Sequence, residues 1–122
     1  MALAKLDVVV LDCPDPHALA GFYAAVLGGT VEGDSEGGAW VDLRLPGGTG
    51  LAFQRAPGFV APRWPAPDAS QQFHLDLAVE DLDAAEKGVL ELGAKPLDTQ
   101  DRQRTFRVYA DPAGHPFCLC AC

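Results

Sequence analysis

The stretch QFHLDLAVEDLDAAEKGVLELGAKPL, residues 72–97, changes from one hydrophobic period to another. Its first part alternates every second residue, which is the period of a strand with one apolar face. The apolar face would carry Phe73, Leu75, Leu77 and Val79. The opposite face would carry His74, Asp76 and Ala78. The second part has the spacing of an amphipathic helix, so the stretch predicts a strand followed by a helix.

The predicted helix has recognisable ends. Asp81 suits the N-cap and Gly93 suits the C-terminal stop. Its apolar stripe would be Leu82, Ala85, Val89 and Leu92. The same signals occur in LDVVVLDCPDPHALAGFYAAVLGG, residues 6–29, where Asp15 can cap and Pro16 fits the first helical position. The apolar stripe of this earlier helix would be Leu19, Phe22, Tyr23 and Val26, and Gly28 and Gly29 follow it.

The two halves of the chain repeat one order of elements. Aligning Asp81 with Asp15, 66 residues earlier, pairs His74 with Val8. Three strand-like runs follow each predicted helix. They are TVEGD, AWVDLRL and GLAFQR in the first half, then AKPLD, RTFRVYA and HPFCLC in the second. Each half therefore predicts a βαβββ module. The predicted parts are module one at 1–55, a proline-rich connector at 56–71 and module two at 72–122.

Composition narrows the class of protein. A chain of 122 residues, 48% of them hydrophobic, predicts one domain with a packed core. The net charge of -8, with nine Lys and Arg, argues against nucleic acid as a partner, because that affinity rests on cationic contacts. No apolar run reaches the roughly 20 residues of a membrane span. We expect a soluble protein without a membrane partner.

The cysteines predict a reducing compartment. They stand at positions 13, 118, 120 and 122, without a C-x-x-C pair or the paired spacings of a structural zinc site. Residues i and i+2 of a strand lie about 6.6 Å apart, which is too far for an unstrained disulfide. We expect reduced thiols and a cytoplasmic location.

The duplicated pattern resembles the vicinal oxygen chelate superfamily, which includes glyoxalase I, bleomycin-resistance proteins and extradiol dioxygenases. The resemblance rests on VVLDCPDPHALAGFYAAVLGG, HLDLAVEDLDAAEKGVLELGA and YADPAGHPFCL and spans nearly the whole chain. It implies an α+β fold in which two βαβββ modules form a curved, incompletely closed mixed sheet around a cavity, with the helices outside. It also implies a homodimer. A ferredoxin-like fold would leave too many strands unassigned.

If the apolar faces of the strands pack on the helices, the opposite side chains point into the cavity. In module one these are Val8, Val10, Asp12, Trp40, Asp42, Arg44, Ala52 and Gln54. In module two they are His74, Asp76, Ala78, Arg107, Tyr109, Cys118 and Cys120. From them we expect the following residues to contact a ligand: Trp40, Arg44, Gln54, His74, Arg107, Tyr109 and Cys118.

Metal-dependent members of the superfamily hold their ion with residues from the first and fourth strands of each module. By this resemblance His74 matches a ligand position, whereas Val8 holds the equivalent place in module one and has no donor atom. Cys118 stands where relatives usually have glutamate, and Gln54 offers a weak amide oxygen. We favour no metal. If an ion is bound, the expected ligands are His74, Gln54 and Cys118.

His74 has three interpretations. It can be a metal ligand, a general base oriented by Asp76, or a cavity-wall histidine that bonds to Asp76, Gln54 or a tyrosine. His74 and Asp76 are the candidate catalytic residues, and Cys118 is a possible nucleophile if its thiol is reactive. On its strand, His74 would meet Asp76 only if both side chains lean toward each other.

The remaining aromatic and charged residues leave alternatives open. Trp64 either pins the connector or forms a recognition surface, and Arg44 and Arg107 either bind a ligand or pair with an internal aspartate. His17 is expected to be exposed, and His115 to shape a turn. The sequence favours a protein that binds a small organic molecule, with a divalent-metal-dependent isomerase, lyase or dioxygenase as the alternative.

Overall fold

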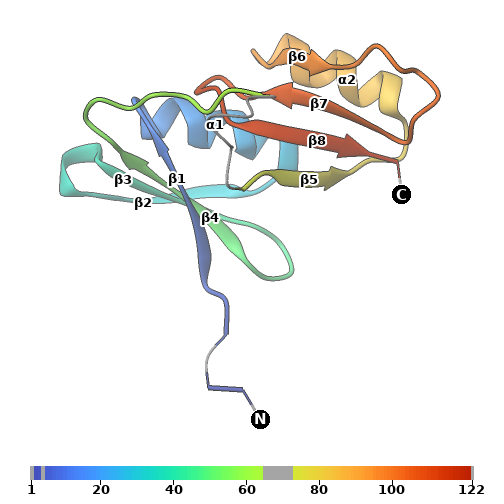
Figure 1. The fold of residues 1–122 in the computed structure, drawn as a ribbon. Coiled ribbons are helices and arrows are strands. Elements are labelled where there is room, and N and C mark those ends of the chain that lie inside the picture. The colour runs from blue at the N-terminus through green and yellow to red at the C-terminus, as the bar shows by residue number, and fades with distance from the viewer. Residues whose placement is uncertain (1, 4, 65–72, 122) are drawn as a thin grey trace. The chain divides into compact units, whose positions relative to one another are not determined.

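A computed structural model describes residues 2–3, 5–64 and 73–121 of the chain (Figure 1). The chain divides into two compact units, Met1–Phe59 and Val60–Cys122, which we call the first and second module. Of the predicted connector, residues 56–59 belong to the first module and 60–64 to the second. Part of the connector, Gln72 of the predicted strand and Cys122 lie outside the described residues.

Each module has the predicted βαβββ order. The first contains β1 (Val8–Cys13), α1 (Pro16–Leu27), β2 (Thr30–Ser35), a 3-10 turn (Glu36–Gly38), β3 (Trp40–Arg44) and β4 (Gly50–Arg55). The second contains β5 (Leu75–Ala78), α2 (Leu82–Glu91), β6 (Lys95–Asp98), β7 (Phe106–Ala110) and β8 (Pro116–Cys120). The α+β fold of two repeated modules is therefore confirmed.

The two sheets have the same strand order. It is β1-β4-β3-β2 in the first module and β5-β8-β7-β6 in the second. In each, the first strand pairs in parallel with the fourth, and the other pairings are antiparallel. The sheets are mixed, as expected. A helix packs on one side of each sheet, and we call the two sides the helix face and the far face.

The helices begin at the predicted caps. The side chain of Asp15 accepts a hydrogen bond from the Ala18 amide at 3.2 Å, and Asp81 accepts one from the Ala84 amide at 3.1 Å. Each cap of this kind stabilises its helix by about 1 kcal/mol. Helix α1 ends at Gly28, whose φ of 78° is a left-handed conformation that glycine adopts without strain. Neither helix among the described residues is long and apolar enough to span a bilayer.

The apolar stripe predicted for the second helix is only partly correct. Val89 is buried, whereas Leu92 is 43% exposed and follows the last residue of α2. Phe73 is 86% exposed and precedes β5, so it does not belong to the apolar face of that strand. The alternation in the sequence extended beyond the segment that actually pairs with β8.

Candidate functional site

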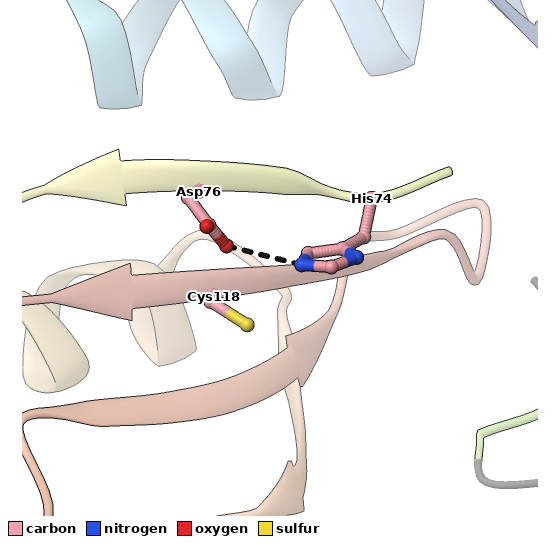
Figure 2. A group of neighbouring side chains, drawn as sticks. All are labelled: His74, Asp76 and Cys118. Carbon is pink, nitrogen blue, oxygen red and sulfur yellow. Dashed lines mark ion pairs between the residues drawn. The ribbon is translucent and has the colours of Figure 1, made fainter. Parts of the chain in front are cut away.

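Strand register places three polar side chains on the far face of the second sheet. Asp76 in β5 pairs directly with Cys118 in β8, and paired residues point to the same side of a sheet. His74 immediately precedes β5, and its ring lies on this face because it contacts the Asp76 carboxylate at 3.2 Å. Figure 2 shows His74 and Asp76 leaning toward each other beside Cys118. The sequence prediction that these three residues share a face is correct.

The three residues form a compact cluster. His74 Nε2 lies 3.2 Å from Asp76 Oδ1, and the donor atoms of His74, Asp76 and Cys118 all lie within 4.8 Å of one another. The side chains of His74 and Asp76 are 37% and 62% exposed, whereas Cys118 is buried. The cluster therefore joins two exposed polar side chains to one buried cysteine.

The environment of Cys118 disfavours its thiolate. Burial raises the pKa of the Cys118 thiol to about 12, and the charge of Asp76, with a hydrogen bond to it, adds to the shift. The sulfur is therefore protonated at neutral pH. A thiol in this state is a poor nucleophile, which argues against covalent catalysis by Cys118.

The predicted placement of Arg107 and Tyr109 on the cavity side is wrong. Arg107 pairs with Leu119 and Tyr109 with Phe117 on the helix face of the sheet. The guanidinium of Arg107 lies 3.0 Å from Asp83 of α2, and the Tyr109 hydroxyl donates to Glu86 of α2 at 2.8 Å. The expectation failed because it assumed that α2 packs on the sheet only through apolar side chains.

The residues missed on the far face are apolar. Val108 pairs with Cys118, and Phe106 with Cys120, so these strand β7 residues accompany the cluster. The sequence did contain a signal that Arg107 faces the helix. Asp83 and Glu86 are three residues apart, on one side of the predicted helix, where they can face a basic residue on the sheet.

A groove lies in the second module beside the cluster. It has a volume of about 480 Å³. Its lining residues are Ala61, Pro62, Arg63, Trp64, Leu97, Ala110 and Gly114. The Trp64 ring contacts the His74 ring edge-on, with centroids 6.3 Å apart. Trp64 therefore both holds the described part of the connector against the module and forms a wall of the groove.

The first module also has the predicted far face. Register joins Asp12, Gln54 and Trp40 in one row, and Val10, Ala52 and Asp42 in the next. The Trp40 indole donates to Asp42 at 3.1 Å. Arg44 forms an ion pair with Glu32 at 2.7 Å through side chains that are 74% and 45% exposed, so Arg44 makes a surface pair in place of the expected internal pair with an aspartate.

A smaller hollow of about 260 Å³ lies on the first module. Its lining residues are Asp7, Val8, Glu32, Asp42, Leu43, Arg44, Gly48, Gly50 and Leu51. It includes Val8, whose aliphatic side chain cannot hold a metal ion. Gln54 is exposed at the end of β4, and its predicted part in a metal site stays a prediction.

Two of the predicted metal ligands, Gln54 and Cys118, do not occupy equivalent positions on the fourth strands of the two modules. Cys118 lies opposite Asp76, and the equivalent pair in the first module is Val10 with Ala52. The first-module residue equivalent to Cys118 is therefore Ala52, which has no donor atom. A metal site repeated in both modules does not fit these side chains.

The other histidines lie as expected. His17 is exposed in the first turn of α1. His115 closes the turn before β8, where its backbone N–H donates to the Asp111 carboxylate at 3.0 Å and its carbonyl accepts from the Asp111 amide at 2.9 Å. Both backbone groups therefore stabilise the turn.

Comparison with known proteins identifies the fold. A sequence model of the glyoxalase-like domain family matches residues 8–120. A glyoxalase/bleomycin resistance protein/dioxygenase family enzyme from Burkholderia phytofirmans PsJN has a similar structure, with a TM-score of 0.72 and 16% identity over 95% of this chain and 97% of that chain. A possible glyoxalase from Bacillus cereus gives a TM-score of 0.72 at 18% identity, over 98% of this chain and 100% of that chain.

An antibiotic-binding protein, TnmS3 from Streptomyces sp. CB03234, is also similar, with a TM-score of 0.65 and 20% identity over 99% of this chain and 98% of that chain. The search of curated proteins gave no match. These structural similarities fall below 25% identity, so they establish the fold and leave the ligand open.

Proposed function

Since the chain belongs to the glyoxalase-like domain family, within the vicinal oxygen chelate superfamily, we propose that it binds a small, flat organic molecule in the groove beside Trp64. The groove of about 480 Å³ is the observation that carries this proposal, because its size falls in the usual range for small-molecule sites. Most of its walls are apolar, and the Trp64 ring offers a surface on which a planar group can stack. The antibiotic-binding relative supports a small-molecule ligand.

The charge of the chain favours a cationic ligand. A net charge of -8 attracts cations to the surface and raises their rate of encounter. Arg63 lines the same groove and opposes this preference locally, so the preference for a cation rests on the net charge of the whole chain. We therefore expect planar cationic antibiotics to bind more tightly than planar anions.

The described side chains do not fit the two-module metal site that the superfamily resemblance implies. Val8 and Ala52 supply no donor atoms at the positions equivalent to His74 and Cys118. Binding of the organic molecule then depends on stacking, burial and charge. The cytoplasmic location and the homodimer remain predictions from the sequence.

Tryptophan fluorescence tests this proposal, because the chain has two tryptophans, one in each module. In W40F, Trp64 is the only tryptophan, and we expect a panel of planar cationic antibiotics to give saturable quenching. In W64F the smaller ring keeps only part of the stacking, which contributes about 0.5 to 1.5 kcal/mol for an aromatic pair, so binding should weaken by up to about tenfold. Calorimetry measures that loss, and W40F is the matched control with unchanged affinity.

Two outcomes would count against the proposal. If W64F binds as tightly as the unmodified protein and W40F does not, the ligand binds the first module. If no antibiotic of the panel binds to either variant or to the unmodified protein, the proposed ligand class is wrong.

A second candidate function is a divalent-metal-dependent isomerase, lyase or dioxygenase. The cluster of His74, Asp76 and Cys118 is the observation that favours it. A divalent ion bound there would supply Lewis acidity toward neighbouring substrate oxygens. Elemental analysis of protein purified without a polyhistidine tag tests this function. Less than about a tenth of an equivalent of metal, with no activity after zinc, nickel, manganese or iron is added, would exclude it.

A further inference from the structure

The cluster in the second module differs from the metal site that the superfamily resemblance implies. That implied site takes ligands from the first and fourth strands of both modules, whereas His74, Asp76 and Cys118 all belong to one module. Asp76 is the additional residue. It lies in β5, directly opposite Cys118 in β8, and its carboxylate already contacts the His74 ring.

The three donor atoms have nearly the spacing of zinc ligands. Zinc binds nitrogen, oxygen and sulfur at roughly 2.0 to 2.3 Å, so donors around one tetrahedral ion lie roughly 3.5 Å apart. His74 Nε2 and Asp76 Oδ1 are 3.2 Å apart, and the donor atoms all lie within 4.8 Å of one another. Small rotations of the two exposed side chains, His74 and Asp76, would close the remaining difference around the fixed Cys118 sulfur.

The types of donor select among ions. A thiolate and an imidazole suit zinc, whereas magnesium and manganese prefer sites made of oxygen atoms. One nitrogen, one oxygen and one sulfur donor leave the fourth tetrahedral position open, as in catalytic zinc sites. Binding would release the Cys118 proton to solvent, since the thiolate is the ligand.

We propose that His74, Asp76 and Cys118 form a three-ligand zinc site contained wholly within the second module. The inference deepens the second candidate function by naming its ion and ligands, and it does not depend on the proposed binding of an organic molecule, which the fluorescence titration tests separately. It would place the ion next to the Trp64 wall of the groove, because the His74 ring contacts Trp64.

Cobalt spectroscopy tests the proposal with protein purified without a polyhistidine tag and kept reduced. Titration with Co²⁺ should give a sulfur-to-cobalt charge-transfer band in the near ultraviolet, saturating at about one ion per chain, together with release of about one proton. Addition of Zn²⁺ should remove the band. Failure of the band to appear in the unmodified protein would overturn the proposal.

Single substitutions assign the ligands. C118S should abolish the charge-transfer band, and H74Q should weaken zinc binding by more than about 100-fold, the upper loss seen for outer-shell partners alone. C120S is the matched control, because Cys120 lies on the same strand and the same face as Cys118. A band that survives C118S and disappears in C120S or C122S would overturn the assignment.

Q54A distinguishes this site from one built by both modules. The single-module site predicts an unchanged cobalt spectrum in Q54A, and a lost spectrum would overturn the proposal. X-ray absorption of the zinc-loaded unmodified protein avoids any folding defect of the variants. We expect one sulfur at about 2.3 Å with nitrogen and oxygen neighbours at about 2.0 Å. A zinc shell without sulfur, or with two sulfurs, would contradict the proposed ligands.

Discussion

The two modules share their strand order and their helix caps, but they hold their helices on the sheet in different ways. Helix α1 buries Leu19, Phe22 and Tyr23, and the Tyr23 ring stacks on Phe53 of β4 with centroids 5.9 Å apart. Helix α2 buries only Val89. The first module therefore attaches its helix by apolar burial, and the second module relies on other contacts.

Those other contacts are ionic. Arg107 of β7 lies 3.0 Å from Asp83 and 3.6 Å from Glu86, both on α2. Glu86 also accepts hydrogen bonds from Tyr109 at 2.8 Å and from both terminal nitrogens of Arg102, at 3.2 and 3.1 Å. The same βαβββ topology can therefore hold its helix on the sheet either by an apolar interface or by a charged network centred on Glu86.

The charged network gives less net stability than its number of bonds suggests. Arg107 is 4% exposed, and its Nε atom has no hydrogen-bond partner among the described residues. Removing a guanidinium from water has a large desolvation cost, which the two carboxylates only partly offset. We expect the first module to depend on packing and the second to depend on charge.

The largest expected effect comes from the apolar interface. F53A removes the ring that stacks on Tyr23 and should lower the free energy of unfolding by about 3 to 5 kcal/mol, because it leaves a cavity under α1. Urea unfolding measures this loss in a W64F background, where Trp40 reports on the first module. V10A is the control, since Val10 is 40% exposed, and its cost should stay within about 0.5 kcal/mol. Equal losses in F53A and V10A would contradict packing as the source of stability.

R107M should have the next largest effect. It removes the buried guanidinium that lies 3.0 Å from Asp83 and 3.6 Å from Glu86, and a charged contact at hydrogen-bond distance, such as the one to Asp83, contributes about 1.5 to 3 kcal/mol. Urea unfolding of W40F variants, with Trp64 as the reporter, measures this loss in the second module. The matched control is R44M, because Arg44 forms its ion pair with Glu32 through a side chain that is 74% exposed.

An exposed pair of that kind contributes roughly 0 to 1 kcal/mol. Measured in the W64F background, R44M should therefore change the stability of the first module little. If R44M lowers the free energy of unfolding as much as R107M does, the burial of Arg107 does not explain why the second module depends on charge.

The comparison also explains how far the sequence can predict this protein. Hydrophobic period, caps at Asp15 and Asp81 and turn residues predicted both modules, because apolar burial and capping leave a local pattern in the chain. The same reasoning misplaced Arg107 and Tyr109. Their side chains point to the helix face because carboxylates on α2 face them, and such a pairing joins residues 21 to 24 positions apart.

The candidate site was predictable to a similar degree. The positions of His74, Asp76 and Cys118 on one face followed from alternation alone. The approach of Asp76 to both other residues depends on the register between β5 and β8, which local periodicity does not determine. The groove beside Trp64 depends on how the connector packs on its module. The proline content of the connector does not predict which face of the module it packs on.

The smallest expected effect is a dependence on pH that only the second module should show. The hydrogen bond from Arg102 lowers the pKa of Glu86 below its ordinary value of 4.5, against the opposing effect of burial. A carboxylate with a lowered folded pKa contributes stability that is present above 4.5 and is lost as the pH falls through the folded value.

E86Q isolates this contribution, because its amide oxygen can still accept hydrogen bonds but does not titrate. In the W40F background the urea midpoint of the Glu86 protein should exceed that of E86Q at neutral pH, and the gap should shrink on acidification. Other carboxylates that titrate in the same range are present in both proteins, so the difference between the two midpoints removes their effect. A gap that stays constant with pH would show that Glu86 acts by its shape and hydrogen bonds. In that case the charge of Glu86 would not explain why the stability of the second module differs from that of the first in its dependence on pH.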